Sequence, residues 1–76
     1  MKELVEFLVS ELVSDPDAVR VSETEDERGF RYQVEVAPGD MGKVIGRGGR
    51  TAKAIRTVVR AAATRVDAGA IVDFVD

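Results

Sequence analysis

At residues 42–50 the chain reads GKVIGRGGR, which places four glycines and three cations within nine residues. The residues on both sides have helical spacing, so this segment is predicted to be a tight connection between two helices. Glycine lets a ligand approach the backbone closely, and a helix N-terminus carries partial positive charge. The segment is therefore the first candidate for a phosphate-binding loop.

Two common phosphate-binding loops do not match this segment. A P-loop requires Ser or Thr directly after Gly-Lys, whereas Val44 follows Lys43. A dinucleotide fingerprint requires a third glycine where this chain has Thr51. A helix–loop–helix whose bare backbone contacts a sugar-phosphate chain, with Arg47 and Arg50 beside it, uses every feature of the segment.

The residues before the loop predict one helix and one hairpin. Apolar residues recur at helical spacing over residues 2–14, and Pro16 cannot continue that helix. Residues 19–22 and 30–36 alternate between apolar and polar side chains, as strands with one buried face do. The polar, glycine-ended segment 25–29 between them predicts the loop of an antiparallel hairpin.

The residues around and after the loop complete the fold. Asp40 is the predicted N-cap of a short helix over residues 41–45. Apolar spacing predicts a long helix over residues 50–66 that Gly69 ends, and residues 70–75 are rich in strand formers. The predicted fold class is α+β, with a three-stranded sheet packed on helices and one domain over residues 1–76.

The charges are unevenly distributed along the chain. Residues 1–40 hold eleven acidic and four basic side chains, whereas residues 41–66 hold seven basic side chains and no acidic ones. A polyanion responds to the field within about 8 Å at physiological salt rather than to the total charge. The net charge of −3 is therefore compatible with nucleic-acid binding by the basic segment.

The composition argues against enzyme chemistry. The chain has no cysteine and no histidine, which removes disulfides, thiolate nucleophiles and the usual zinc ligands. The carboxylates of residues 23–27 fall in or near a hairpin loop, too exposed to have tuned pKa values. We expect no enzyme activity, no cofactor and no metal. The acidic N-terminal segment has neither a signal peptide nor a membrane-spanning stretch, so we expect a cytoplasmic protein without membrane contact.

The loop and the basic helix after it carry a family resemblance. Residues 44–49 read VIGRGG, which resembles the Ile-Gly-x-x-Gly core of KH domains. Residues 42–59, the chain length and the leading helix are similar to the KhpA family of small bacterial KH proteins. The resemblance implies a type II KH domain, with the element order α-β-β-α-(GxxG)-α-β.

The same resemblance implies a binding site for single-stranded RNA. The backbone of residues 46–49 would contact the phosphates of about four nucleotides, with the bases in a groove beside the loop. The floor of that groove would come from Val44, Ile45, the helix near Ala52, and Val34 or Val36. The cationic track would extend to Arg60. The implied RNA-binding residues are Lys43, Val44, Ile45, Gly46, Arg47, Gly48, Gly49, Arg50, Lys53 and Arg56. No aromatic residue lies in the loop, so we expect weak binding of low specificity.

Partners and cellular role rest on the resemblance as well. It implies that the protein forms a homodimer and a heteromer with a KhpB-type KH protein. It also implies that the protein is an RNA chaperone or post-transcriptional regulator, linked to cell shape, cell elongation, cell wall biogenesis and envelope homeostasis. Phe7 lies off the apolar face of the first helix and is a candidate dimer contact. Two alternatives are a ribosome-associated or rRNA-processing factor, and a protein-interaction KH domain that binds no RNA.

Overall fold

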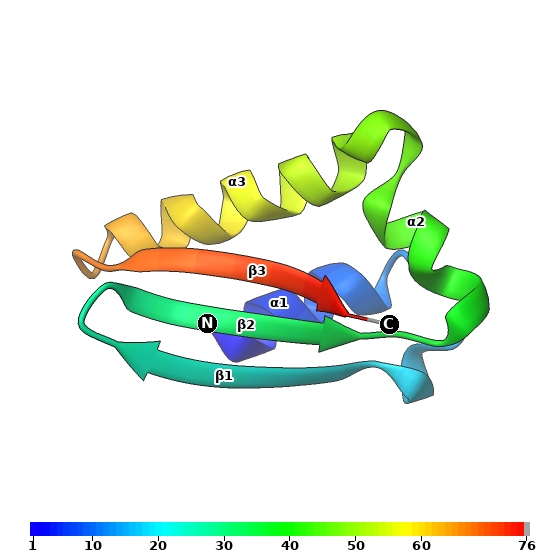
Figure 1. Ribbon diagram of the computed structural model, residues 1–76, viewed down its shortest axis with the longest axis horizontal. Coiled ribbons are helices and arrows are strands. Elements are labelled where there is room, and N and C mark those ends of the chain that lie inside the picture. The colour runs from blue at the N-terminus through cyan, green and yellow to red at the C-terminus, as the bar shows by residue number, and fades with distance from the viewer. Residues whose placement is uncertain (76) are drawn as a thin grey trace.

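The computed structural model describes residues 1–75 as a two-layer arrangement of helices and a sheet (Figure 1). Short 3-10 turns lie at Pro16–Ala18, Pro38–Asp40 and Arg47–Gly49. The α-helices and strands are α1 (Lys2–Ser10), β1 (Arg20–Asp26), β2 (Gly29–Glu35), α2 (Met41–Ile45), α3 (Arg50–Thr64) and β3 (Gly69–Val75). This order confirms the predicted α+β class and the type II KH arrangement.

The sheet has the strand order β1-β2-β3, so β2 is central and β3 is an edge strand. β1 and β2 pair antiparallel, whereas β2 and β3 pair parallel, with Tyr32 opposite Val72. In Figure 1, α1 lies behind the sheet and α3 runs alongside β3. The glycine loop is at one end of the molecule, and the hairpin turn and the α3–β3 turn are at the other.

The core lies between the sheet and the helices. Alternate residues of the strands point into it, as the two-residue period of a strand requires. Tyr32 is fully buried at its centre, and its ring stacks on Phe30 with centroids 6.3 Å apart. Burial, together with the nearby Glu23 carboxylate, raises the pKa of the Tyr32 hydroxyl. The core residues are Val5, Val9, Val21, Tyr32, Val34, Val44, Ile55, Val59, Ala63, Ala70 and Val72.

The first helix is shorter than predicted. α1 ends at Ser10 rather than at residue 14, although Val13 still packs against the core. The N–H of Asp15 donates to the carboxylate of Asp40 at 3.1 Å. This bond joins the segment that follows α1 to the start of α2, a tertiary contact that apolar spacing does not reveal.

Two turns also differ from prediction. β1 and β2 extend to Asp26 and Gly29, so only residues 27–28 connect them. The Asp26 carboxylate accepts the N–H of Arg28 at 2.8 Å, a local bond that favours a tight turn. The residue with left-handed backbone after α3 is Asp67, with φ 56°, rather than the predicted glycine. Asp67 can take that conformation because aspartate tolerates it better than most residues.

Candidate nucleic-acid interface

The glycine loop joins α2 to α3 through the single turn Arg47–Gly49. Gly46 has φ 77° and ψ 171°, a region that is essentially restricted to glycine. A Cβ atom at Gly46 would collide with the side chain of Thr51 in the first turn of α3. Gly48 and Gly49 also have positive φ but face open space. Gly46 therefore packs against α3, while Gly48 is exposed. Gly49 is half-buried, and its N–H donates to the carbonyl of Gly46 at 3.2 Å.

The N-terminus of α3 is held by backbone bonds of the preceding turn: the N–H of Gly49 donates to the carbonyl of Gly46, and the N–H of Arg50 donates to that of Arg47. Its N-cap residue is Gly49, no side chain caps it, and its first turn has no acidic residue. The first N–H groups of a helix have no partner within the helix, and together with the helix dipole they attract anions. The loop thus leads directly into a helix end that no side chain caps and no acidic residue neutralises.

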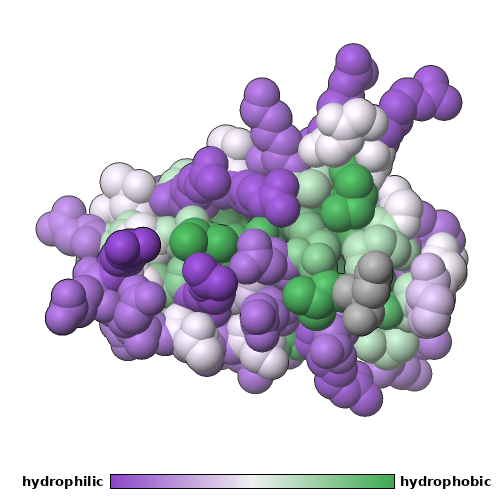
Figure 2. All heavy atoms as spheres, viewed as in Figure 1, coloured by the Kyte–Doolittle hydropathy of each residue, from purple (hydrophilic) through white to green (hydrophobic). Residues whose placement is uncertain are grey.

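Three exposed cations surround this helix end: Arg47, Arg50 and Lys53. None of the ion pairs found within residues 1–75 involves them. Figure 2 shows hydrophilic side chains over the loop and α3, with apolar side chains gathered between α2 and the end of β3. The cations of the loop are therefore available to an external polyanion.

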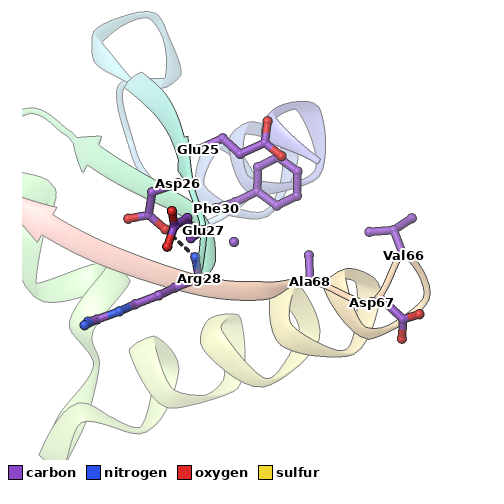
Figure 3. A pocket seen from close by; sticks show the side chains of 9 residues that line it. Glu25, Asp26, Glu27, Arg28, Phe30, Val66, Asp67 and Ala68 are labelled. Atoms are coloured by element: carbon purple, nitrogen blue, oxygen red, sulfur yellow. Dashed lines mark hydrogen bonds between the residues drawn. The ribbon is translucent and has the colours of Figure 1, made fainter.

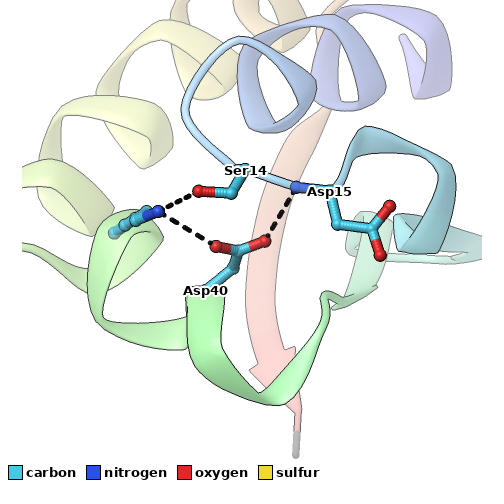
Figure 4. A network of polar contacts seen from close by, with 4 residues as sticks. Ser14, Asp15 and Asp40 are labelled. Carbon is cyan, nitrogen blue, oxygen red and sulfur yellow. Dashed lines mark hydrogen bonds and ion pairs between the residues drawn. The ribbon is translucent and has the colours of Figure 1, made fainter.

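Lys43 differs from these cations because it has internal partners. Its Nζ lies 3.3 Å from Oδ1 of Asp40 and also donates to the hydroxyl of Ser14 (Figure 4). Asp40 is 4% exposed, and its second oxygen accepts the N–H of Asp15. Burial opposes ionisation, but the N–H groups of Ser14 and Asp15 and the Lys43 ammonium outweigh it and lower the pKa of Asp40. Asp40 occupies the predicted N-cap position, yet its carboxylate links the linker to α2 instead of capping the helix.

Arg56 also has fixed contacts. Its Nε donates to the carbonyl of Val72 at 3.0 Å, and its guanidinium carbon lies 5.6 Å from the centroid of the Phe74 ring. Both partners belong to β3, so Arg56 lies on the side of α3 that faces the edge strand. The sequence resemblance implied that Arg56 binds RNA, but the sequence does not indicate this contact with β3.

Several residues that were predicted to form the groove floor are buried in the structure. Val34, Val44 and Ala52 are buried in the core, so their side chains do not form an accessible surface. Ile45 is partly exposed, and Phe74 is a partly exposed aromatic residue that the sequence did not assign to the site. Because Arg56 of α3 contacts Val72 and Phe74, the strand beside this side of α3 is the edge strand β3. The sequence predicted a strand over residues 70–75, but it did not indicate that Phe74 lies beside this helix.

A cavity of about 410 Å³ lies at the opposite end of the molecule (Figure 3). The hairpin turn and the turn after α3 line it, and it carries the carboxylates of Glu25, Asp26, Glu27 and Asp67. These charges repel phosphate, so this cavity is separate from the candidate interface.

Comparison with known families settles the classification. The family model described as the KhpA/KhpB KH domain matches residues 2–74. The chain belongs to this KH-domain family. A relative from Halalkalibacterium halodurans, named RNA-binding protein KhpA, is 51% identical over 76 residues and covers 100% of both chains.

Other relatives bear the same name. The one from Clostridium acetobutylicum is 48% identical over 75 residues, covering 99% of this chain and 100% of its own. The one from Streptomyces coelicolor is 49% identical over 76 residues, covering 100% of this chain and 92% of its own. In this KH domain, no helix within residues 1–75 is long and apolar enough to cross a membrane.

Proposed function

We propose that this KH domain binds single-stranded RNA through the glycine loop and the first turns of α3. The observation that carries the proposal is the N-terminus of α3, which no side chain caps. It follows the open glycine positions 48 and 49, and its cations form no ion pair within residues 1–75. The name RNA-binding protein KhpA, borne by relatives about half identical over the whole chain, supports it.

The residues have distinct roles in this proposal. The backbone of Gly48 and Gly49 approaches the phosphates, and Arg47, Arg50 and Lys53 neutralise them. The bases lie over the partly exposed Ile45 and Phe74 rather than over the buried valines. The acidic end of the molecule repels RNA, which restricts binding to the basic end.

We expect RNA binding to weaken as salt rises. Three phosphate contacts give a slope of log affinity against log salt of about −2 for a single strand. Affinity for a fluorescent RNA octamer should thus fall roughly 15-fold between 50 and 200 mM salt. Fluorescence anisotropy across that range measures the slope. A flat dependence, or no binding at 50 mM salt, contradicts the proposal.

The proposal extends to a non-enzymatic RNA chaperone or post-transcriptional regulator in the cytoplasm that acts as a homodimer or with a KhpB-type KH protein. The family description, which joins KhpA and KhpB, supports such a partner. Two linked domains contact more nucleotides than one and gain affinity through effective concentration. The connection to cell elongation and the cell envelope is part of the same proposal.

Phe7 is the candidate contact for self-association. Its side chain is 61% exposed on α1, and Val5 and Val9 rather than Phe7 face the core. We expect Phe7→Ser to shift the protein from dimer to monomer with little change in thermal stability, because the ring makes no core contact. Sedimentation equilibrium measures the shift. A wild-type protein that stays monomeric at high concentration, or a variant that dimerises equally well, excludes this surface.

A further inference from the structure

Arg56 is held more rigidly than the loop cations. A guanidinium has five N–H donors in one plane. In Arg56 the Nε–H is bound to the carbonyl of Val72 at 3.0 Å, and the Phe74 ring lies 5.6 Å away. Within residues 1–75, no hydrogen bond engages the Nη atoms. Arg56 therefore presents its two Nη atoms as a fork whose direction is fixed by β3.

We propose that Arg56 selects bases that present two adjacent hydrogen-bond acceptors. Cytosine has O2 and N3 on one edge, and guanine has O6 and N7 on another. Uracil has an N–H between its carbonyls. Adenine has its amino donor beside N1 and N7, and its N3 has no second acceptor beside it. A fixed fork of two donors therefore favours cytosine or guanine. This inference rests on the proposed RNA-binding function and goes further by naming the class of base.

The surroundings of Arg56 favour a base over a phosphate. Arg56 is partly buried between α3 and the edge strand, whereas Arg47, Arg50 and Lys53 are exposed beside the helix end. A phosphate loses more hydration than a planar base when it enters a site lined by an aromatic ring. Arg56 lies six residues beyond Arg50, about 9 Å along the helix axis. A base can therefore reach it while the phosphates stay at the N-terminus of α3.

The experiment compares RNA octamers by fluorescence anisotropy. We expect wild-type protein to bind oligocytidine about tenfold more tightly than oligouridine, the discrimination typical of a bidentate arginine. Arg56→Lys keeps the charge but loses the fork, so the two affinities should become equal within about twofold. Arg65→Lys makes the same change at the far end of α3 and should keep the preference. Uridine octamers with one central cytosine, guanine or 7-deazaguanine then distinguish the two acceptor edges.

The possible outcomes separate this inference from the function on which it rests. Equal binding of oligocytidine and oligouridine by wild-type protein, with neither guanine nor cytosine preferred in the mixed octamers, overturns the inference alone. A preference that survives in Arg56→Lys also overturns it. Failure to bind any octamer at 50 mM salt overturns the proposed function and the inference together. A shift of the Arg56 Nε resonance on adding oligocytidine but not oligouridine supports the inference without a variant.

Discussion

Changing Arg47 and Gly48 together to Asp should abolish most RNA binding while the domain stays folded. Gly48 has φ 64° and its Cβ would meet no atom within 4 Å, and aspartate tolerates that backbone conformation. Loss of the Arg47 guanidinium removes one phosphate contact, and the two new carboxylates repel the remaining phosphates. We expect affinity for an RNA octamer to fall at least about 30-fold, roughly 2 kcal/mol. Anisotropy in vitro and crosslinking to cellular RNA both measure the loss.

A matched control separates loop contacts from net charge. Arg28→Asp with Arg31→Gln lowers the net charge by the same three units, but at the hairpin turn and on β2. Both arginines are exposed, and the Arg31 bridge to Asp73 is an exposed pair of little energetic value. This control should bind RNA within about threefold of wild type. Equal loss in both variants would show that only overall charge matters.

The second large effect concerns stability and should distinguish two glycines of the same loop. Gly46→Ala forces a side chain into a backbone region restricted to glycine and against the side chain of Thr51. We expect a loss of about 3 kcal/mol, which lowers Tm by roughly 15 °C in a domain of this size. Gly48→Ala meets no atom and should cost only about 1 kcal/mol. Thermal denaturation followed by circular dichroism measures both.

Gly42→Ala serves as the reference for this pair. Gly42 lies in α2, and a Cβ there has nothing within 4 Å, so alanine should be neutral or slightly stabilising. Comparable Tm values for the alanine variants at positions 46 and 48 would mean that Thr51 does not hold Gly46 in its conformation.

Local features of the sequence were sufficient to predict the loop and the fold class. Gly46, Gly48 and Gly49 lie within four residues of the chain, and all three have positive φ, a conformation that favours glycine. The order of helices and strands follows from periodicity, which is also local. These features sufficed to place the loop at the start of a basic helix.

Contacts between distant segments could not be predicted in the same way. The Asp15–Asp40 bond joins residues 25 apart in the chain, and Lys43 contacts Asp40 and Ser14. The contact of Arg56 with β3 follows from parallel pairing beside α3, which periodicity does not determine. The structure therefore adds Phe74 to the candidate site and shows that Val34 and Val44 are buried in the core.

The contact between Arg56 and Val72 also bears on aggregation. β3 is an edge strand rich in apolar residues, and an open strand edge offers unpaired backbone groups to other chains. The Nε of Arg56 occupies the Val72 carbonyl at this edge. Because only the Nη atoms of Arg56 are proposed to contact a base, the Val72 carbonyl keeps its hydrogen bond to Nε when RNA is bound. Position 56 thus meets the proposed ligand and covers part of the strand edge, and a small apolar residue there would do neither.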